Sequence, residues 1–155
     1  MFTIMNKTLT LTYRQIVILN GVLAGLTLDS EKSSARRRFN RIIDPHIDDY
    51  NAEVEQIKRK YSEKNKDGQT IAETSGAIVY TAENRKKCNA DIQALEEAKV
   101  KIDVLESNLP DLSKISDMLK GRVKELEEKS KDGYESIVYD TVCEINGIVE
   151  SLNIS

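Results

Sequence analysis

The sequence has few of the residues that most often build catalytic and metal sites. It contains no tryptophan, one histidine and two cysteines. His46 cannot complete a zinc site with Cys88 and Cys143, because the two cysteines lie far apart and neither belongs to a Cys-x-x-Cys pair. We therefore expect two reduced, partly buried thiols and no bound metal or cofactor. A disulfide or a catalytic thiol is the alternative.

Proline, glycine and long apolar runs are also scarce. Two prolines and seven glycines in 155 residues leave little room for a disordered linker, and we expect a single domain over residues 1–155. The apolar run Ile16–Leu28 is interrupted by Asn20, Gly21 and Gly25. It is shorter than the ~20 apolar residues that cross a bilayer, and it lacks the cleavage site of a secretory signal. We expect this run in the core, the protein in the cytoplasm, and no membrane partner.

The chain carries no motif of a known catalytic or nucleotide-binding site. Gly-rich phosphate loops, the Gly-x-Ser-x-Gly nucleophile turn and the His-Glu-x-x-His zinc motif are all missing. The net charge of −3 argues against a general nucleic-acid binder. These absences indicate a non-enzymatic protein.

What the sequence does have is a long amphipathic segment from Ser30 to Gly68. Apolar residues recur at alternating steps of three and four, which places them on one helix face. They are Ala35, Phe39, Ile42, Ile43, Ile47, Tyr50, Val54, Ile57 and Tyr61. Pro45 would either kink this helix or begin a new one behind an Asp44 cap. The stripe stays in phase across Pro45, so we predict one kinked helix near residues 31–65 that supplies the main core and buries Phe39.

The remaining segments alternate between strand and helix patterns. Thr12 is a candidate N-cap for a helix that closes at Gly25. The other predicted elements are strands at 8–12, 76–81 (paired with 70–72) and 100–104, and helices at about 82–98, 111–131 and 134–152. We predict an α+β fold that is mainly α. The helices near 31–65 and 82–98 form a long antiparallel hairpin, short strands cover one end, and two C-terminal helices complete the core.

A basic cluster at the start of the long helix is the best candidate for a functional site. Its arginines are Arg36, Arg37, Arg38 and Arg41. Four cations near a helix N-terminus oppose the helix dipole unless acidic neighbours or a partner compensate them. The cluster is therefore either a partner-binding site for a protein, a nucleic-acid contact, or a solvated face paired with the acidic residues Asp44, Asp48, Asp49 and Glu53. Those acidic residues are too few and too dispersed to predict a metal site.

Four stretches in their order along the chain resemble an uncharacterised family of small phage and prophage proteins of Gram-positive bacterial viruses. They are Leu11–Ile16, Lys32–Phe39, Lys60–Gly68 and Tyr139–Glu144. The resemblance implies a phage-encoded accessory protein without an established activity, and it transfers no site residues.

The family resemblance and the composition together predict a protein that binds a phage or host protein, or itself, in virion assembly or structure. It would lie in the host cytoplasm or the virion. The alternatives are a phage inhibitor of a host enzyme or defence system and, as the weakest, a nucleic-acid-binding protein.

Overall fold

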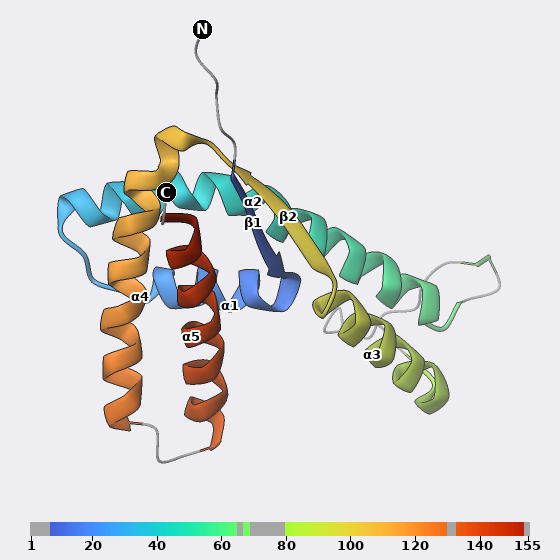
Figure 1. Ribbon diagram of the computed structural model, residues 1–155. Coiled ribbons are helices and arrows are strands. Elements are labelled where there is room, and N and C mark those ends of the chain that lie inside the picture. The colour runs from blue at the N-terminus through green and yellow to red at the C-terminus, as the bar shows by residue number, and fades with distance from the viewer. Residues whose placement is uncertain (1–6, 65–66, 69–79, 130–132, 154–155) are drawn as a thin grey trace, which may run out of the picture.

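The computed structural model describes residues 7–64, 67–68, 80–129 and 133–153 (Figure 1). Within these residues it contains five α-helices and one two-stranded antiparallel sheet. The elements are β1 (Lys7–Thr12), α1 (Tyr13–Ala24), α2 (Ser30–Tyr61), α3 (Ala82–Glu96), β2 (Lys99–Val104), a 3-10 turn (Glu106–Asn108), α4 (Leu109–Lys129) and α5 (Gly133–Asn153). The predicted fold class, α+β and mainly α, is confirmed.

The start of α1 is set by local side-chain chemistry. Thr12 Oγ1 accepts a hydrogen bond from the Gln15 backbone N–H at 3.1 Å, and Gln15 Oε1 accepts one from the Thr12 N–H at 3.0 Å. This reciprocal pair satisfies two backbone donors that the first turn of a helix leaves without partners. Gly25 follows the last helical residue with φ −82°. Both predicted ends of this helix are therefore confirmed, although Gly25 does not use a left-handed conformation.

The sheet joins two distant parts of the chain. β1 runs antiparallel to β2, with Lys7 opposite Val104 and Thr12 opposite Lys99. Leu9 and Ile102 face each other, and both are buried, as the alternating pattern requires. The strands near 8–12 and 100–104 are thus confirmed. The predicted strand at 76–81 and its partner at 70–72 fall largely outside the described residues.

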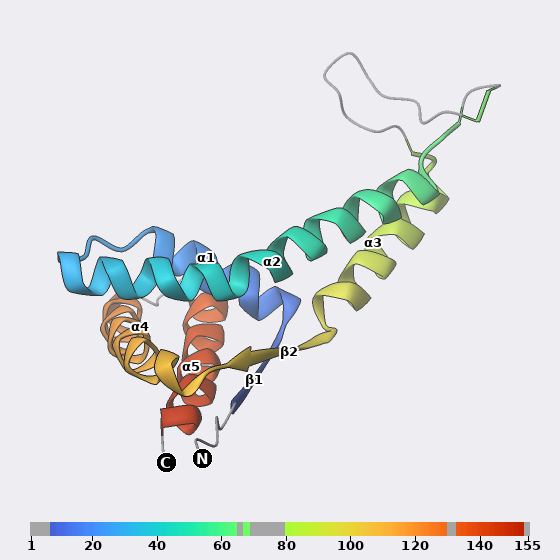
Figure 2. The same cartoon turned by 90° about the horizontal axis from the view of Figure 1, so that it is seen from above.

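The long helix α2 passes through Pro45 without a break, and Figure 2 shows it changing direction near its middle. The predicted single helix is confirmed, but it ends at Tyr61 rather than near residue 65. Ser62 leaves the helical conformation with ψ 152°, and its hydroxyl donates to the Arg59 carbonyl at 2.8 Å. This side chain therefore satisfies one of the carbonyls that the last turn of the helix leaves without a partner.

Most of the core lies where α1, α4, α5, the sheet and the first half of α2 meet, and we call these elements the body. Phe39 is 1% exposed, so its predicted burial is confirmed. The core side chains on β1 and β2 are Leu9, Leu11, Ile102 and Val104, those on α1 and α2 are Ile16, Leu19, Leu23, Ala35, Phe39 and Ile43, and those on α4 and α5 are Leu112, Ile115, Met118, Leu119, Val142, Ile145 and Val149.

The second half of α2, from Asp44 to Tyr61, leaves the body together with α3, and we call this pair the arm. The two helices run antiparallel and project to one side (Figures 1 and 2), so the predicted hairpin is confirmed. The contribution of α2 to the core comes from its first half, which holds the buried residues Ala35, Phe39 and Ile43. Beyond Ile43 none of its apolar side chains is fully buried, because two helices alone cannot enclose a side chain as a multi-element core does.

Candidate functional site

The Arg36 side chain is hydrogen-bonded to the C-terminal end of α1. Its Nη1 donates to the carbonyl oxygens of Leu23 and Leu26, at 2.7 and 2.9 Å. Carbonyls at and just beyond a helix C-terminus lack intrahelical partners and carry the negative end of the helix dipole. The guanidinium therefore satisfies these acceptors and locks α1 against α2. This contact gives Arg36 a structural role.

Arg38 forms a two-point ion pair with Asp111 at the start of α4. Nε and Nη2 of Arg38 donate to the two carboxylate oxygens at 2.8 and 2.7 Å. Asp111 is only 7% exposed. The hydrogen bond from Arg38 holds the pKa of Asp111 below its ordinary value, and the same bond raises the pKa of Arg38. The pair ties the first half of α2 to α4.

Arg37 and Arg41 remain on the surface. Arg37 Nη2 lies 3.5 Å from the Ser34 hydroxyl, at the limit of a hydrogen bond. Arg41 makes no hydrogen bond or ion pair with any residue that the structure describes. The acidic residues Asp44, Asp48, Asp49 and Glu53 form no ion pair with the four arginines either. Arg37 and Arg41 are therefore the members of the predicted cluster that are available to a partner.

Residues of the chain itself compensate the positive charge at the N-terminus of α2. Asp29 Oδ1 caps the helix by accepting from the Lys32 N–H at 2.8 Å, and Glu31 in the first turn pairs with Lys114 at 3.0 Å. Together with the partners of Arg36 and Arg38, these contacts supply the compensating negative charge. The arginine density is thus no reason by itself to infer an interface.

At the base of the arm, two contacts involve Tyr13 of the body, and a third joins the two arm helices. The rings of Tyr13 on α1 and Tyr50 on α2 lie 5.6 Å apart, and Tyr50 Oη donates to Glu96 Oε1 at 3.1 Å. The Tyr13 N–H donates to the Ala98 carbonyl at 3.2 Å. Burial, and then the Glu96 carboxylate, raise the pKa of Tyr50, which keeps its hydroxyl protonated and donating. These contacts fix the angle at which the arm leaves the body.

Further along, Tyr61 Oη donates to Asp91 Oδ2 at 2.6 Å. This bond lies at the end of α2 and joins it to α3. The half-buried residues Val54 and Ile57 lie between the two tyrosines on the α2 stripe. The two arm helices are therefore joined by a tyrosine–carboxylate hydrogen bond near the body and by another at the end of α2.

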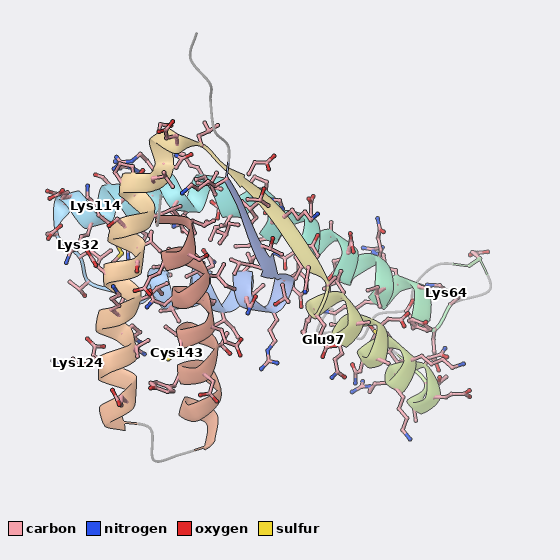
Figure 3. The ribbon with its side chains drawn as sticks, viewed as in Figure 1. Lys32, Lys64, Glu97, Lys114, Lys124 and Cys143 are labelled. Carbon is pink, nitrogen blue, oxygen red and sulfur yellow. The ribbon has the colours of Figure 1, made fainter. Side chains whose placement is uncertain are left out.

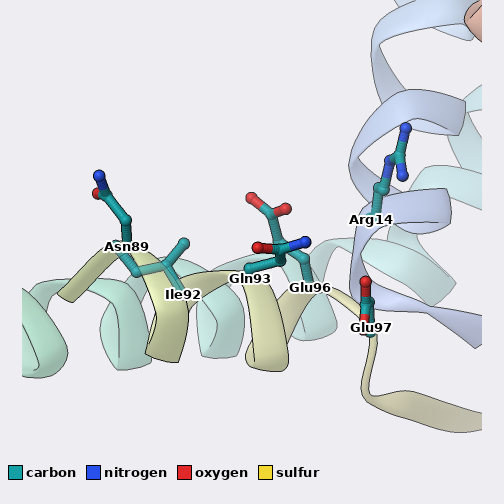
Figure 4. Close-up of a pocket in the computed structure, with 6 residues that line it drawn as sticks. All are labelled: Arg14, Asn89, Ile92, Gln93, Glu96 and Glu97. Atoms are coloured by element: carbon teal, nitrogen blue, oxygen red, sulfur yellow. The ribbon is translucent and has the colours of Figure 1, made fainter. Parts of the chain in front are cut away.

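A shallow hollow lies at the junction of the arm and the body. Its volume is about 340 Å³, and its lining consists of Arg14, Asn89, Ile92, Gln93, Glu96 and Glu97 (Figure 4). A second hollow of about 170 Å³ shares Arg14, Glu96 and Glu97 with it and continues toward Thr141 and Glu144 on α5. The lining is polar, of mixed charge, and has no histidine or cysteine. It offers neither a nucleophile–base pair nor the apolar walls typical of small-molecule sites.

The other chemically active side chains lie apart from one another. Cys88 is buried in the arm and Cys143 is half-buried on α5, and both are free thiols. His46 is half-buried on α2 among the exposed Asp44 and Asp48. Over the part of the chain that the structure describes, no three histidine, cysteine, aspartate or glutamate side chains are grouped to hold a metal ion.

Comparisons with protein-family models, with curated proteins and with solved structures find no match. In the described residues, none of the helices combines the length and apolar character needed to cross a membrane.

One feature of the arm, its pattern of charge, is absent from the predicted site residues. Each of its helices has a block of acidic residues near the body and a block of basic residues at the far end. The signal is present in the sequence as charge runs, but only the antiparallel pairing of α2 and α3 places like blocks side by side.

Proposed function

We propose that this chain is a phage-encoded accessory protein that acts by binding another protein and has no catalytic activity. The observation that carries the proposal is the arm. It extends beyond the body, and Cys88 is the only apolar side chain of its described residues that is fully buried. A hairpin that adds so little to the core is best explained by what it contacts.

The way the arm is held supports this use. Its base is fixed by the Tyr13–Tyr50 ring contact and the Tyr50–Glu96 hydrogen bond, and its far end by the Tyr61–Asp91 bond. A surface that is already ordered loses less conformational entropy on binding than a flexible segment does. The arm therefore presents a preorganised helical surface, of the kind that partners recognise along exposed helix faces.

Arg37 and Arg41 form a second candidate surface on the first half of α2. Both are exposed, and they lie one helical turn apart on the same face. They can contact acidic groups of a partner without disturbing the body. Arg36 and Arg38 are bound internally, so we leave them out of the proposed surface.

The test is affinity capture from infected cells with variants that block each surface. Ala52 and Ala90 are exposed on the two arm helices, and Ala52→Arg with Ala90→Arg keeps helix propensity while adding bulk and charge. We expect this variant to lose the partner. The matched control is Gly121→Arg with Gly147→Arg on the body, where an added Cβ meets nothing within 4 Å; it should keep the partner.

A third variant, Arg37→Gln with Arg41→Gln, reports on the second surface. Retention of every captured protein by both the arm variant and the arginine variant would overturn the proposal. Mass spectrometry of purified particles then separates the two roles: presence in the virion indicates assembly or structure, and absence with early expression indicates an inhibitor of a host enzyme or defence system.

A further inference from the structure

The charges on the arm are segregated along its length. On α2, the segment 44–55 carries five carboxylates and no lysine or arginine, and Lys58, Arg59 and Lys60 follow it. On α3, Glu83 in the first turn is followed by Arg85, Lys86 and Lys87, and the segment 89–97 then carries three carboxylates and no lysine or arginine. We call the six cations the basic block and the eight carboxylates the acidic block.

The fold brings the matching halves of each block together. Because α2 ends and α3 begins at the far end of the arm, both basic runs lie toward the tip and most of the carboxylates lie near the body (Figures 1 and 3). Asp91 is the exception, because its bond to Tyr61 places it beside the end of the α2 basic run. On each helix the centres of the two runs are about nine residues apart, which is about 14 Å at the helical rise. The arm is therefore a rod with a positive tip and a negative base.

These charges are largely unused within the chain. Among the described residues of the two blocks, the one ion pair joins Lys87 to Glu83, at 3.4 Å. Lys60 and Arg85 lie over the rings of Tyr61 and Tyr80, and Asp91 and Glu96 accept the tyrosine hydroxyls described above. Lys58, Arg59 and Lys86 have no partner in the described part of the chain.

We propose that the arm binds the arm of a second copy of this chain, antiparallel and about a two-fold axis, so that each basic block meets the partner's acidic block. A two-fold interface requires a surface complementary to itself, and equal block spacing on both helices provides one. Nucleic acid or an acidic protein would pair only with the cations toward the tip and would be repelled by the carboxylates near the body. This inference rests on the proposed function, since it names a partner for the same arm.

Exposed ion pairs are individually weak and are screened by salt. We therefore expect a dimer that forms at low ionic strength. Its dissociation constant should rise by a factor of about ten or more as NaCl rises from about 0.02 to about 0.5 M. Sedimentation velocity over a concentration series measures this directly. A wild-type chain that stays monomeric at about 1 mM and low salt, a concentration that exceeds the dissociation constants of weak pairs, would overturn the proposal.

Charge-reversed variants identify the surface. The tip variant carries Lys58→Glu, Arg59→Glu and Lys86→Glu, and the base variant carries Asp48→Lys, Asp49→Lys and Glu53→Lys; none of these six side chains makes an ion pair in the described residues. Each variant alone should dimerise more weakly than the wild type, because the three changes reduce the net charge of the basic block from +6 to 0, or that of the acidic block from −8 to −2. An equimolar mixture should form more dimer than either variant alone, because the unchanged acidic block of one variant then meets the unchanged basic block of the other.

The recovery of dimers in the mixture is the decisive result, because loss of folding cannot produce it. The control is Lys32→Glu, Lys101→Glu and Lys124→Glu, which changes the net charge as much as the tip variant but at exposed positions on the body; Figure 3 shows Lys32 and Lys124 away from the arm. It should dimerise like the wild type. A mixture that stays monomeric would refute arm-to-arm pairing.

The outcome is separable from that of the affinity capture. If the mixture stays monomeric while Ala52→Arg with Ala90→Arg loses a captured protein, the arm binds a different partner and the proposed function stands. If that variant keeps every captured protein and neither dimers nor heterodimers form, both proposals fail. If the wild type stays monomeric but binds DNA or heparin, and the tip variant loses that binding, the basic block contacts nucleic acid and the self-association proposal is overturned.

Discussion

Replacing Phe39 with alanine tests where the stability of this protein resides. Phe39 is 1% exposed and is the largest of the fully buried side chains. Truncating a buried phenylalanine costs ~3–5 kcal/mol, from lost transfer free energy and from the cavity that remains. In a chain of this size each kcal/mol of lost stability lowers the melting temperature by ~2–4 °C. The melting temperature should therefore fall by ~6–20 °C.

Val54→Ala on the arm is the comparison. Val54 belongs to the same apolar stripe of α2, but it is only half-buried. Removing part of a half-buried side chain loses about one buried methylene equivalent, or ~0.8 kcal/mol. Urea unfolding followed by circular dichroism gives both free energies on one scale. We expect Phe39→Ala to cost several times more than Val54→Ala.

Equal losses of unfolding free energy in the two variants would refute this reasoning. If Val54→Ala destabilises the protein as much as Phe39→Ala does, the arm is part of the cooperative core and the division into body and arm is wrong. A loss below about 1 kcal/mol for Phe39→Ala, well under the usual cost of such a truncation, would mean that the body packs loosely around α2.

Two further outcomes follow from the contacts. Because Arg38 lowers the folded-state pKa of Asp111 below its ordinary 3.8, the stabilisation from this carboxylate is present above that pH and is lost as the pH falls through the folded value. Asp111→Asn should therefore destabilise the protein at neutral pH, and its melting temperature should converge with that of the wild type in acid. Non-reducing mass spectrometry should find two alkylatable thiols after denaturation; in the native protein the half-buried Cys143 should react before Cys88, which is 4% exposed. A Cys88–Cys143 crosslink, or an acid profile for Asp111→Asn parallel to the wild type, would contradict these contacts.

Local patterns predicted the elements whose cause is local. Thr12 and Gln15 stand three residues apart, the spacing of a reciprocal cap, and the structure contains that cap. The α2 stripe remains in phase across Pro45, and the helix remains continuous. In both cases the residues that decide the structure are neighbours in sequence.

The sequence was less informative where the cause is distant. Arg38 and Asp111 are 73 positions apart, so no spacing rule connects them, and the arginines were interpreted as a partner surface. Periodicity shows that Val54 and Phe39 share a helix face, but not how many elements cover that face at each point. That number depends on the tertiary arrangement, and it separates a core residue from an arm residue.

The pairing of β1 with β2 has a consequence for how the arm can vary. The sheet joins Thr12 to Lys99, so α1, α2 and α3 together form one long excursion that must close before the strands meet. The entropic cost of closing an excursion grows only with the logarithm of its length, ~0.6 kcal/mol for each doubling. Adding or removing matched helical turns in the outer parts of α2 and α3 should therefore change the reach of the arm with little cost to the body. In this architecture, the length of the arm is a quantity that evolution or design can adjust almost independently of the fold.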